Sequence, residues 1–264
     1  MERIDRYETL SHLATRHMTK GVRTNTMVSQ AEYGSAVETG SLLVQETPAG
    51  LLLARDRGDH FRFHFYLHDI TVPLGVDLPV PAVTEVAYRP RDMGLQEAVT
   101  YLQDQGFALL FERIRMSRPA GLPEEETAPV LTAQPQEEEA ILAFLRENFS
   151  PLTGCLPNKK ELKDDITQGY VLLLKEEGAI AGLLHFSFDG KSGEIRHLAL
   201  REDKRGQGLT RPLITGFLRA IGGAKSTVWL RADSPLPRPP TTDWALPPTA
   251  AARLSSVLTN LNDQ

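Results

Sequence analysis

Short runs of alternating apolar and polar residues, separated by turns rich in glycine, occur in both halves of the chain. This pattern is typical of antiparallel strands. In the C-terminal half we expect strands over residues 169–175, 180–188, 194–200 and 226–231, with a closing strand over 254–261. In the N-terminal half we expect strands over residues 40–46, 50–55, 61–67, 81–88 and 106–116.

Apolar residues spaced three and four apart predict helices between these strands. The expected helices cover residues 95–103, 137–148, 159–167 and 209–221. The pattern therefore favours an α+β fold, a mixed and mainly antiparallel sheet flanked by helices. Residues 119–135 are rich in Pro, Glu and Ala without apolar periodicity, which indicates a linker. We expect one domain over residues 1–118 and a second over residues 136–264.

Residues 205–210 join a predicted strand to a predicted helix and read Arg-Gly-Gln-Gly-Leu-Thr. Such a turn directs several backbone N–H groups toward one point at the positive end of a helix, which favours a phosphate. Gly206 and Gly208 leave the backbone open to an anion, and Arg205 adds a positive charge. The alternative is an ordinary turn without a ligand. The sequence contains neither a P-loop motif nor a Gly-x-Gly-x-x-Gly run that opens a βαβ unit.

Residues 136–232 follow the order helix, helix, three antiparallel strands, glycine turn, helix and strand. In this order and in the turn, the chain resembles the GNAT superfamily of acyl-CoA-dependent N-acetyltransferases. The most specific match is to the family's Arg/Gln-x-x-Gly-x-Gly/Ala motif, which starts at Arg205 and includes Gly208. Thr210 departs from the motif, because Gly or Ala is usual at that position.

The resemblance implies roles for residues of the turn and of the strand before it. The backbone of residues 207–210 would hold the pyrophosphate of acetyl-CoA, and the N–H groups of Leu198 and Leu200 would pair with its pantetheine arm. The residues expected to bind the cofactor are Leu198, Ala199, Leu200, Arg205, Gly206, Gln207, Gly208, Leu209 and Thr210.

In some family members the general base, which removes a proton from the attacking amine, is the acidic residue of a Glu-Ile pair early in this strand, and Glu194-Ile195 matches that pair. The alternative is a solvated carboxylate at the end of a strand. Strict alternation would put Glu194 on one face with Arg196, Leu198 and Leu200, and His197 on the other with Ile195 and Ala199. We interpret His197 as a core or interface residue rather than a proton shuttle.

These features lead to a functional expectation. The resemblance implies an N-acetyltransferase that moves an acyl group from acetyl-CoA to an amine, in a small molecule or a peptide, by direct attack and without a metal. The alternatives are a GNAT-fold protein that binds acyl-CoA or a partner without turnover, and an unrelated nucleotide-phosphate binder. The N-terminal half repeats the order of strands and helix without the phosphate turn. We expect it to be a degenerate GNAT-like repeat with a structural or acceptor-shaping role.

Residues 235–250 interrupt the family pattern. Prolines from Pro235 to Pro248 exclude the helix that should follow the fifth strand, and with it the tyrosine that often protonates the leaving thiolate. One shifted reading frame through these residues can spell Ala-Tyr-Tyr-Arg-Leu-Gly-Phe, which is close to the missing family segment. Our hypothesis is a frameshift. A divergent Pro-rich insertion is the alternative.

Composition and charge narrow the classes further. The 264 residues carry a net charge of −5 without a basic cluster, so we expect no nucleic-acid partner. The charged start of the chain and the absence of a long apolar run predict a cytoplasmic protein without a membrane partner. One cysteine, Cys155, excludes an internal disulfide. His60, His64 and His68 lie on a predicted strand, where residues four apart are about 13 Å apart, too far to share a metal.

Overall fold

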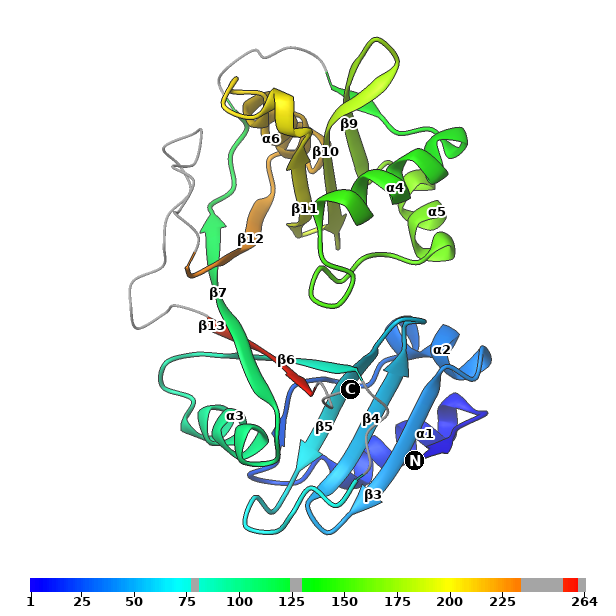
Figure 1. The fold of residues 1–264 in the computed structure, drawn as a ribbon, viewed down its shortest axis with the longest axis vertical. Helices are drawn as coiled ribbons and strands as arrows, with labels where there is room; N and C mark the ends of the chain where they lie inside the picture. Colours follow the sequence, from blue (N-terminus) through cyan, green and yellow to red (C-terminus); the bar gives the residue numbers. More distant parts are fainter. Residues whose placement is uncertain (77–80, 124–129, 234–253, 261–264) are drawn as a thin grey trace. The chain divides into compact units, whose positions relative to one another are not determined.

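A computed structural model describes residues 1–76, 81–123, 130–233 and 254–260 (Figure 1). The chain divides into two compact units. The first comprises Met1–Arg113 with Thr249–Gln264, and the second comprises Ile114–Pro248. The change from one unit to the other falls within strand β7, Ala108–Arg118. Each unit is a sheet with helices packed against it, so the predicted α+β class is confirmed.

The first unit has a mainly antiparallel sheet in the order β1-β3-β4-β5-β6-β13. Its strands are β1 Glu2–Arg3, β2 Arg23–Thr24, β3 Leu42–Thr47, β4 Gly50–Asp56, β5 Phe61–Leu67, β6 Ala82–Tyr88 and β13 Leu254–Asn260. Its helices are α1 Tyr7–His17, α2 Gln30–Glu38 and α3 Met93–Asp104. Two buried clusters stabilise it, one between α1, α2 and the sheet and the other around α3.

The second unit has the strand order β12-β11-β10-β9-β8. Its strands are β8 Leu131–Thr132, β9 Val171–Glu176, β10 Ala179–Phe188, β11 Ser192–Leu200 and β12 Lys225–Arg231. Its helices are α4 Glu138–Asn148, α5 Lys159–Thr167 and α6 Thr210–Ala220, with short 3₁₀ helices η1 Pro135–Glu137 and η2 Glu202–Lys204. The helices predicted for this half are present within a few residues of their expected ends.

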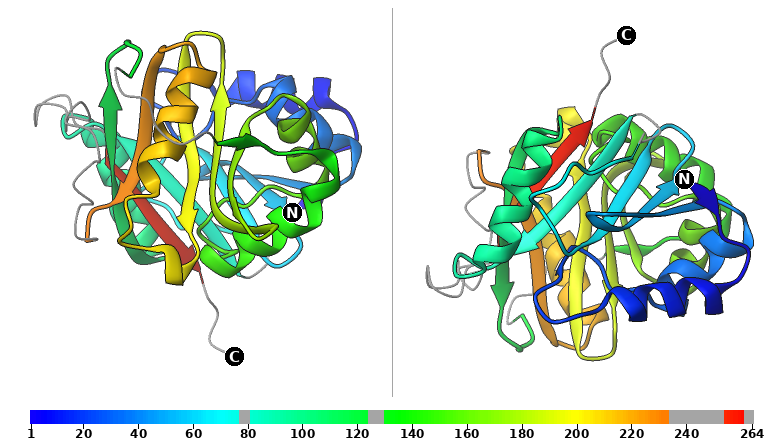
Figure 2. Two further views of the ribbon diagram at one scale, coloured as in Figure 1. Left: turned by 90° about the horizontal axis from the view of Figure 1, so that it is seen from above. Right: turned by 90° about the horizontal axis from the view of Figure 1, so that it is seen from below.

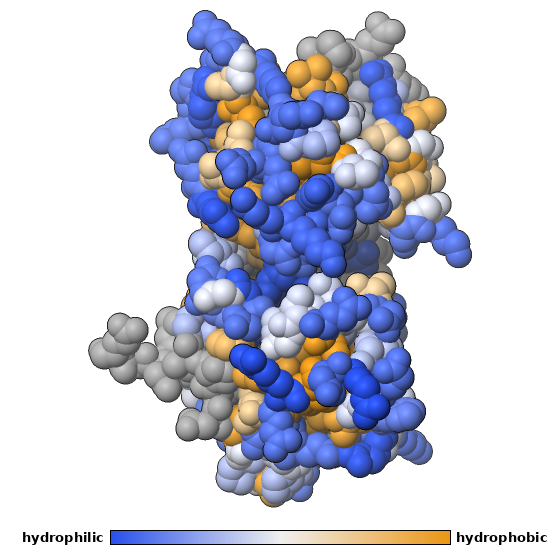
Figure 3. Space-filling model, turned by 90° about the vertical axis from the view of Figure 1, so that its right-hand side faces the viewer, coloured by the Kyte–Doolittle hydropathy of each residue, from blue (hydrophilic) through white to orange (hydrophobic). Residues whose placement is uncertain are grey.

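The two faces of the second sheet carry different helices (Figure 2). Leu213 and Phe217 of α6 pack with Phe186 on one face. Ile141 of α4 and Leu162 of α5 belong to a second cluster on the opposite face, together with strand residues Leu173 and Leu183. Burial of a Phe or Leu side chain stabilises the fold by about 1.5–3 kcal/mol. On the face drawn in Figure 3, hydrophilic side chains cover most of each unit. The buried apolar residues on both faces thus fix the helices on the second sheet.

Two ranges differ from the prediction. Part of the expected linker is folded into the second unit, because β8 pairs with β9 and η1 leads into α4. The tail strand β13 pairs antiparallel with β6, from Leu254↔Tyr88 to Asn260↔Ala82, so it belongs to the first unit rather than to residues 136–264. Val257 and Leu258 are buried there, and the burial of these apolar side chains stabilises the pairing of β13 with β6. The Pro-rich residues 235–250 and the frameshift hypothesis lie outside the described residues.

Candidate active site

The turn between β11 and α6 contains two glycines in the left-handed region of backbone conformation. Gly206 and Gly208 adopt φ angles of 75° and 76°, which side chains other than Asn and Asp rarely tolerate. A Cβ atom built on either glycine would meet no atom within 4 Å, so the turn faces open space. Within the described part of the chain, the backbone N–H groups of residues 207–210 donate no hydrogen bond. These donors lie at the positive end of α6 and can therefore receive an anion.

Arg205 is held beside this turn. Its Nε donates to the carbonyl oxygen of Leu200 at 3.2 Å, and its Nη2 donates to Oδ1 of Asn148 at 3.3 Å. Arg201 also donates to Asp203 at 2.6 Å, and this bond keeps the pKa of the Asp203 carboxyl below its usual range. The loop before the turn is thus tied to β11 and α4. The Arg205 charge is fixed next to the unpaired N–H groups.

A cavity of about 290 Å³ lies beside the turn. It is lined by Asn148, Phe149, Leu198, Ala199, Leu200, Arg205 and Thr210. Five of these residues are among those predicted to bind the cofactor. Asn148 and Phe149, at the end of α4, were not predicted, because only the folded chain brings them next to β11. Gly206, Gln207, Gly208 and Leu209 do not line the cavity and form the turn between Arg205 and Thr210.

One edge of β11 is open next to this cavity. The parallel pairing of β11 with β12 ends at Ile195↔Val228. On its other edge β11 stays paired with β10 as far as Leu200↔Gly182. Among the described residues, no strand pairs with the β12-facing edge of residues 197–200. Backbone groups on such an edge can bind an extended ligand as an added strand.

A β-bulge in β11 overturns the predicted alternation of its side chains. The register with β10 passes from His185↔His197 directly to Phe186↔Ile195, which leaves Arg196 as an extra residue. The extra residue reverses the alternation beyond it. Glu194 therefore shares a face with His197 and Ala199, toward α4 and α5. Leu198 and Leu200 share the α6 face with Ile195.

Glu194 is half-buried and does not line the cavity. The Thr227 hydroxyl lies 3.5 Å from Oε2 of Glu194, at the limit of a hydrogen bond. Nη2 of Arg115 donates to the same hydroxyl at 3.3 Å, and the Arg115 guanidinium lies 5.9 Å from the Trp229 ring centre. Neither Arg115 nor Thr227 was predicted from the sequence. A carboxylate at this position has a polar neighbour and a nearby positive charge.

A buried series of hydrogen bonds crosses the face of the sheet toward α4 and α5. Nε2 of His185 lies 2.9 Å from Oδ2 of Asp165, and the Nδ1 atoms of His185 and His197 are 3.0 Å apart. Nε2 of His197 lies 2.7 Å from the carbonyl oxygen of Gly154, which can only accept. His197 therefore donates to Gly154. For all three contacts to be hydrogen bonds, the side chains of Asp165, His185 and His197 must together carry three protons. A carboxylate and two neutral imidazoles carry only two.

This series of hydrogen bonds fixes the wall of the cavity that Phe149 forms. The Phe149 and His197 rings pack edge to face, with 4.9 Å between their centres. Gly154 admits no side chain, because a Cβ atom there would lie 2.6 Å from the carbonyl oxygen of Ser150. His185 and His197 are 0% and 3% exposed, so each of their hydrogen bonds is costly to lose. His197 is a buried residue, as interpreted from the sequence, and it also supports Phe149.

His60, His64 and His68 of the first unit do not form one cluster. His60 is buried next to Asp59, whereas His68 is exposed and lies 2.8 Å from Nδ1 of His17. Burial lowers the pKa of His64 to about 3. Across the described ranges, no three His, Cys, Asp or Glu side chains are grouped to hold a metal ion. No helix within those ranges is both long and apolar enough to cross a bilayer.

Comparison with known proteins identifies the fold. No protein-family model matches the sequence, and no curated protein sequence matches it. A GNAT-family acetyltransferase from Colwellia psychrerythraea is 11% identical, with a TM-score of 0.52 over 90% of this chain and 99% of its own. A GCN5-related N-acetyltransferase from Sphaerobacter thermophilus is 12% identical, with a TM-score of 0.52 over 91% and 96%.

A GCN5-related N-acetyltransferase from Kribbella flavida is 17% identical, with a TM-score of 0.50 over 90% of this chain and 98% of its own. These similarities extend over most of the chain, beyond the residues that carried the sequence resemblance. The chain has the fold of the GNAT N-acetyltransferases.

Proposed function

We propose that the chain is an N-acyltransferase that uses acetyl-CoA, or another acyl-CoA, as its acyl donor. The observation that carries the proposal is the coincidence of three features in the second unit. Unpaired N–H groups at the start of α6, the fixed Arg205 guanidinium and the open edge of β11 all adjoin one cavity. Together they suit a ligand with a diphosphate at one end and an extended amide-containing arm.

The residues around the cavity would share the binding of acyl-CoA. The N–H groups of residues 207–210 would donate to the diphosphate, assisted by Arg205. The backbone of residues 198–200 would pair with the pantetheine arm. Thr210, which replaces the usual Gly or Ala, lines the cavity, so its methyl and hydroxyl groups would contact the donor. This contact would narrow the space that the family motif leaves free.

The chemistry would be direct transfer. The acceptor amine loses a proton to Glu194, directly or through a water molecule, and its nitrogen attacks the thioester carbon. A C–N bond forms and the C–S bond breaks, so the products are an amide and the CoA thiolate, which takes up a proton. The Thr227 hydroxyl, which accepts from Arg115, would keep Glu194 oriented. The acceptor is an amine of a small molecule or a peptide.

The second candidate is a GNAT-fold protein that binds acyl-CoA without turnover. The absence of a family tyrosine from the sequence of residues 235–250 favours it, because no general acid is then assigned to the leaving thiolate. Release of free thiol from acetyl-CoA, measured with a panel of amines, distinguishes the two. Turnover that falls at least 100-fold in Glu194→Gln supports the enzyme. Binding without any thiol release supports the second candidate.

Binding itself is tested with a matched pair of variants at Gly208. Asn and Asp both tolerate a positive φ and have the same shape, so Gly208→Asn and Gly208→Asp differ only in charge. We expect Gly208→Asp to weaken CoA binding at least 10-fold more than Gly208→Asn. Equal effects would place the diphosphate elsewhere. Tight binding of ATP without binding of CoA would indicate a nucleotide-phosphate site instead.

A further inference from the structure

The first unit contains a split pair of parallel strands like that of the second. β5 and β6 pair only at Phe61↔Ala82 and Arg62↔Val83, whereas β4 follows the other edge of β5 as far as Leu67. Beyond Arg62, β6 therefore leaves one edge of β5. In the second unit β12 leaves β11 in the same way after Ile195. The two units thus present the same kind of strand edge.

In the first unit this edge is covered by the chain itself. β2 pairs antiparallel with the end of β5, at Arg23↔Leu67 and Thr24↔Tyr66. The Thr24 hydroxyl also donates to the carbonyl oxygen of Phe65 at 2.7 Å. Because β4 occupies the opposite edge of β5, β2 lies on the edge that β6 leaves. It has the position of an added strand.

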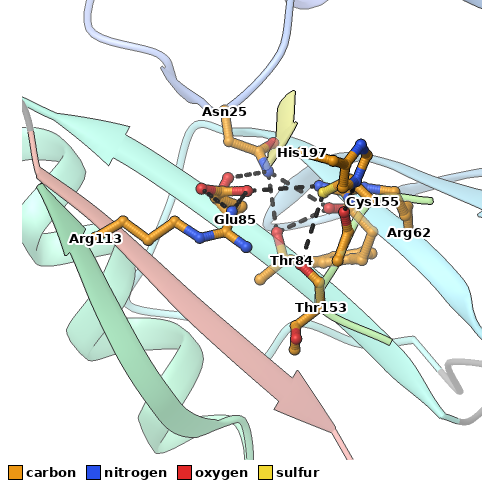
Figure 4. Close-up of polar contacts among 10 residues, drawn as sticks. Asn25, Arg62, Thr84, Glu85, Arg113, Thr153, Cys155 and His197 are labelled. Atoms are coloured by element: carbon orange, nitrogen blue, oxygen red, sulfur yellow. Dashed lines mark hydrogen bonds and ion pairs between the residues drawn. The ribbon is translucent and has the colours of Figure 1, made fainter. Parts of the chain in front are cut away.

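Asn25 bridges the split between β5 and β6 (Figure 4). Its Oδ1 accepts from the N–H of Phe65 at 3.0 Å. Its Nδ2 donates to the carbonyl oxygen of Glu85 at 3.1 Å and to the Thr84 hydroxyl at 2.9 Å. Thr84 in turn donates to the carbonyl oxygen of Phe63 at 2.8 Å. One amide side chain thus supplies the hydrogen bonds that the separated strands do not make to each other.

The segment that covers this edge, residues 23–26, is anchored at both ends. Nη2 of Arg23 donates to Glu97 of α3 at 2.7 Å. The Thr26 hydroxyl lies 2.7 Å from the Tyr33 hydroxyl, and the N–H of Val28 donates to the Tyr66 hydroxyl at 3.1 Å. In the described residues between β5 and β6 there is no helix, so nothing there corresponds to the N-terminus of α6. A ligand arm would have to displace all of these bonds without a phosphate site in return.

We propose that residues 23–26 occupy, in the first unit, the position that the acyl-CoA arm takes in the second. The first unit is then closed to acyl-CoA, and the chain binds one molecule, in the second unit. This inference rests on the function proposed above. Asn25 is the residue that makes the segment fit, because its amide accepts from the N–H of Phe65 on β5 and donates to the carbonyl oxygen of Glu85 on β6.

The stoichiometry of binding tests the inference. Acetyl-CoA is titrated into the full chain by isothermal calorimetry, and we expect one site per chain, at least 10-fold weaker in Gly208→Asp than in Gly208→Asn. Two sites per chain, or one site of equal affinity in both variants, would overturn the inference and leave an acyl-CoA-binding protein. No binding at all would remove the proposed function, and with it the inferred count.

A second measurement tests the covering segment independently of any ligand. Amide hydrogen exchange at Phe65 should speed up at least 10-fold in Asn25→Ala, since its acceptor is lost. Asn25→Asp keeps that acceptor and loses both donors, so Phe65 should stay protected. Unchanged exchange at Phe65 in Asn25→Ala would show that the segment is not held as described, and would overturn the inference.

Discussion

The chain of hydrogen bonds through His185 offers a quantitative test of the second unit. Replacing His185 by Leu keeps an apolar volume but removes the bonds to Asp165 and to Nδ1 of His197. His197 is 3% exposed, so its Nδ1 would have no water in place of His185. Removing one partner of a buried hydrogen bond costs about 1–3 kcal/mol. The side chain of Asp165 is 17% exposed, and we expect it to recover only part of its lost bond from water.

The expected loss for His185→Leu is therefore about 2–4 kcal/mol in the free energy of unfolding. At about 3 °C per kcal/mol for a unit of this size, Tm should fall by about 6–12 °C. The assay is differential scanning calorimetry, which can resolve the two units if they unfold separately. His12→Leu, at an exposed position of α1, is the control and should change the free energy by less than about 0.5 kcal/mol. Equal Tm values for both variants would refute the assigned network.

Three further predictions follow from individual contacts. Gly154→Ala should destabilise the second unit by about 1–3 kcal/mol in urea unfolding, because its Cβ would press on the carbonyl oxygen of Ser150; an unchanged midpoint would contradict the close approach. Phe149→Ala should raise the KM for acetyl-CoA by about 3–10-fold with a smaller change in kcat, because it removes a cavity wall; a selective loss of kcat would give Phe149 another role. His64, whose folded pKa of about 3 lies below its unfolded value because of burial, takes up a proton on unfolding at low pH. The free energy of unfolding of the first unit should therefore fall by up to about 1.4 kcal/mol per pH unit between pH of about 6.5 and about 3. Above that range His64 contributes nothing to the pH dependence. His64→Gln should flatten the slope in pH-dependent calorimetry.

Local patterns predicted most elements, because alternation and helical spacing reflect which side chains face the sheet. The Gly206–Gly208 turn was also predictable, since positive φ angles strongly favour glycine. The bulge at Arg196 was not, because a bulge depends on the register with β10 and leaves no mark in the alternation of one strand. The sequence pattern therefore grouped Glu194 with Leu198 and Leu200, whereas its side chain shares a face with His197.

Contacts between distant segments were also beyond the sequence pattern. Asn148 and Phe149 reach the cavity only because α4 packs on the sheet, and β13 joins β6 across most of the chain length. Asp165 and His185 are 20 residues apart, and nothing in their spacing indicates that they meet. Asn25 was likewise unremarkable in sequence. Its role arises from the split between β5 and β6.

The most direct test of the central claim is to map CoA on the chain residue by residue. Backbone ¹H–¹⁵N spectra of the deuterated protein would be recorded during a titration with CoA. We predict saturable shifts of the amides of residues 198–200 and 207–210, with the amides of residues 23–26 and 65–67 unchanged. Saturable shifts that leave residues 207–210 unmoved, or an unchanged spectrum at millimolar CoA, would contradict the proposed site.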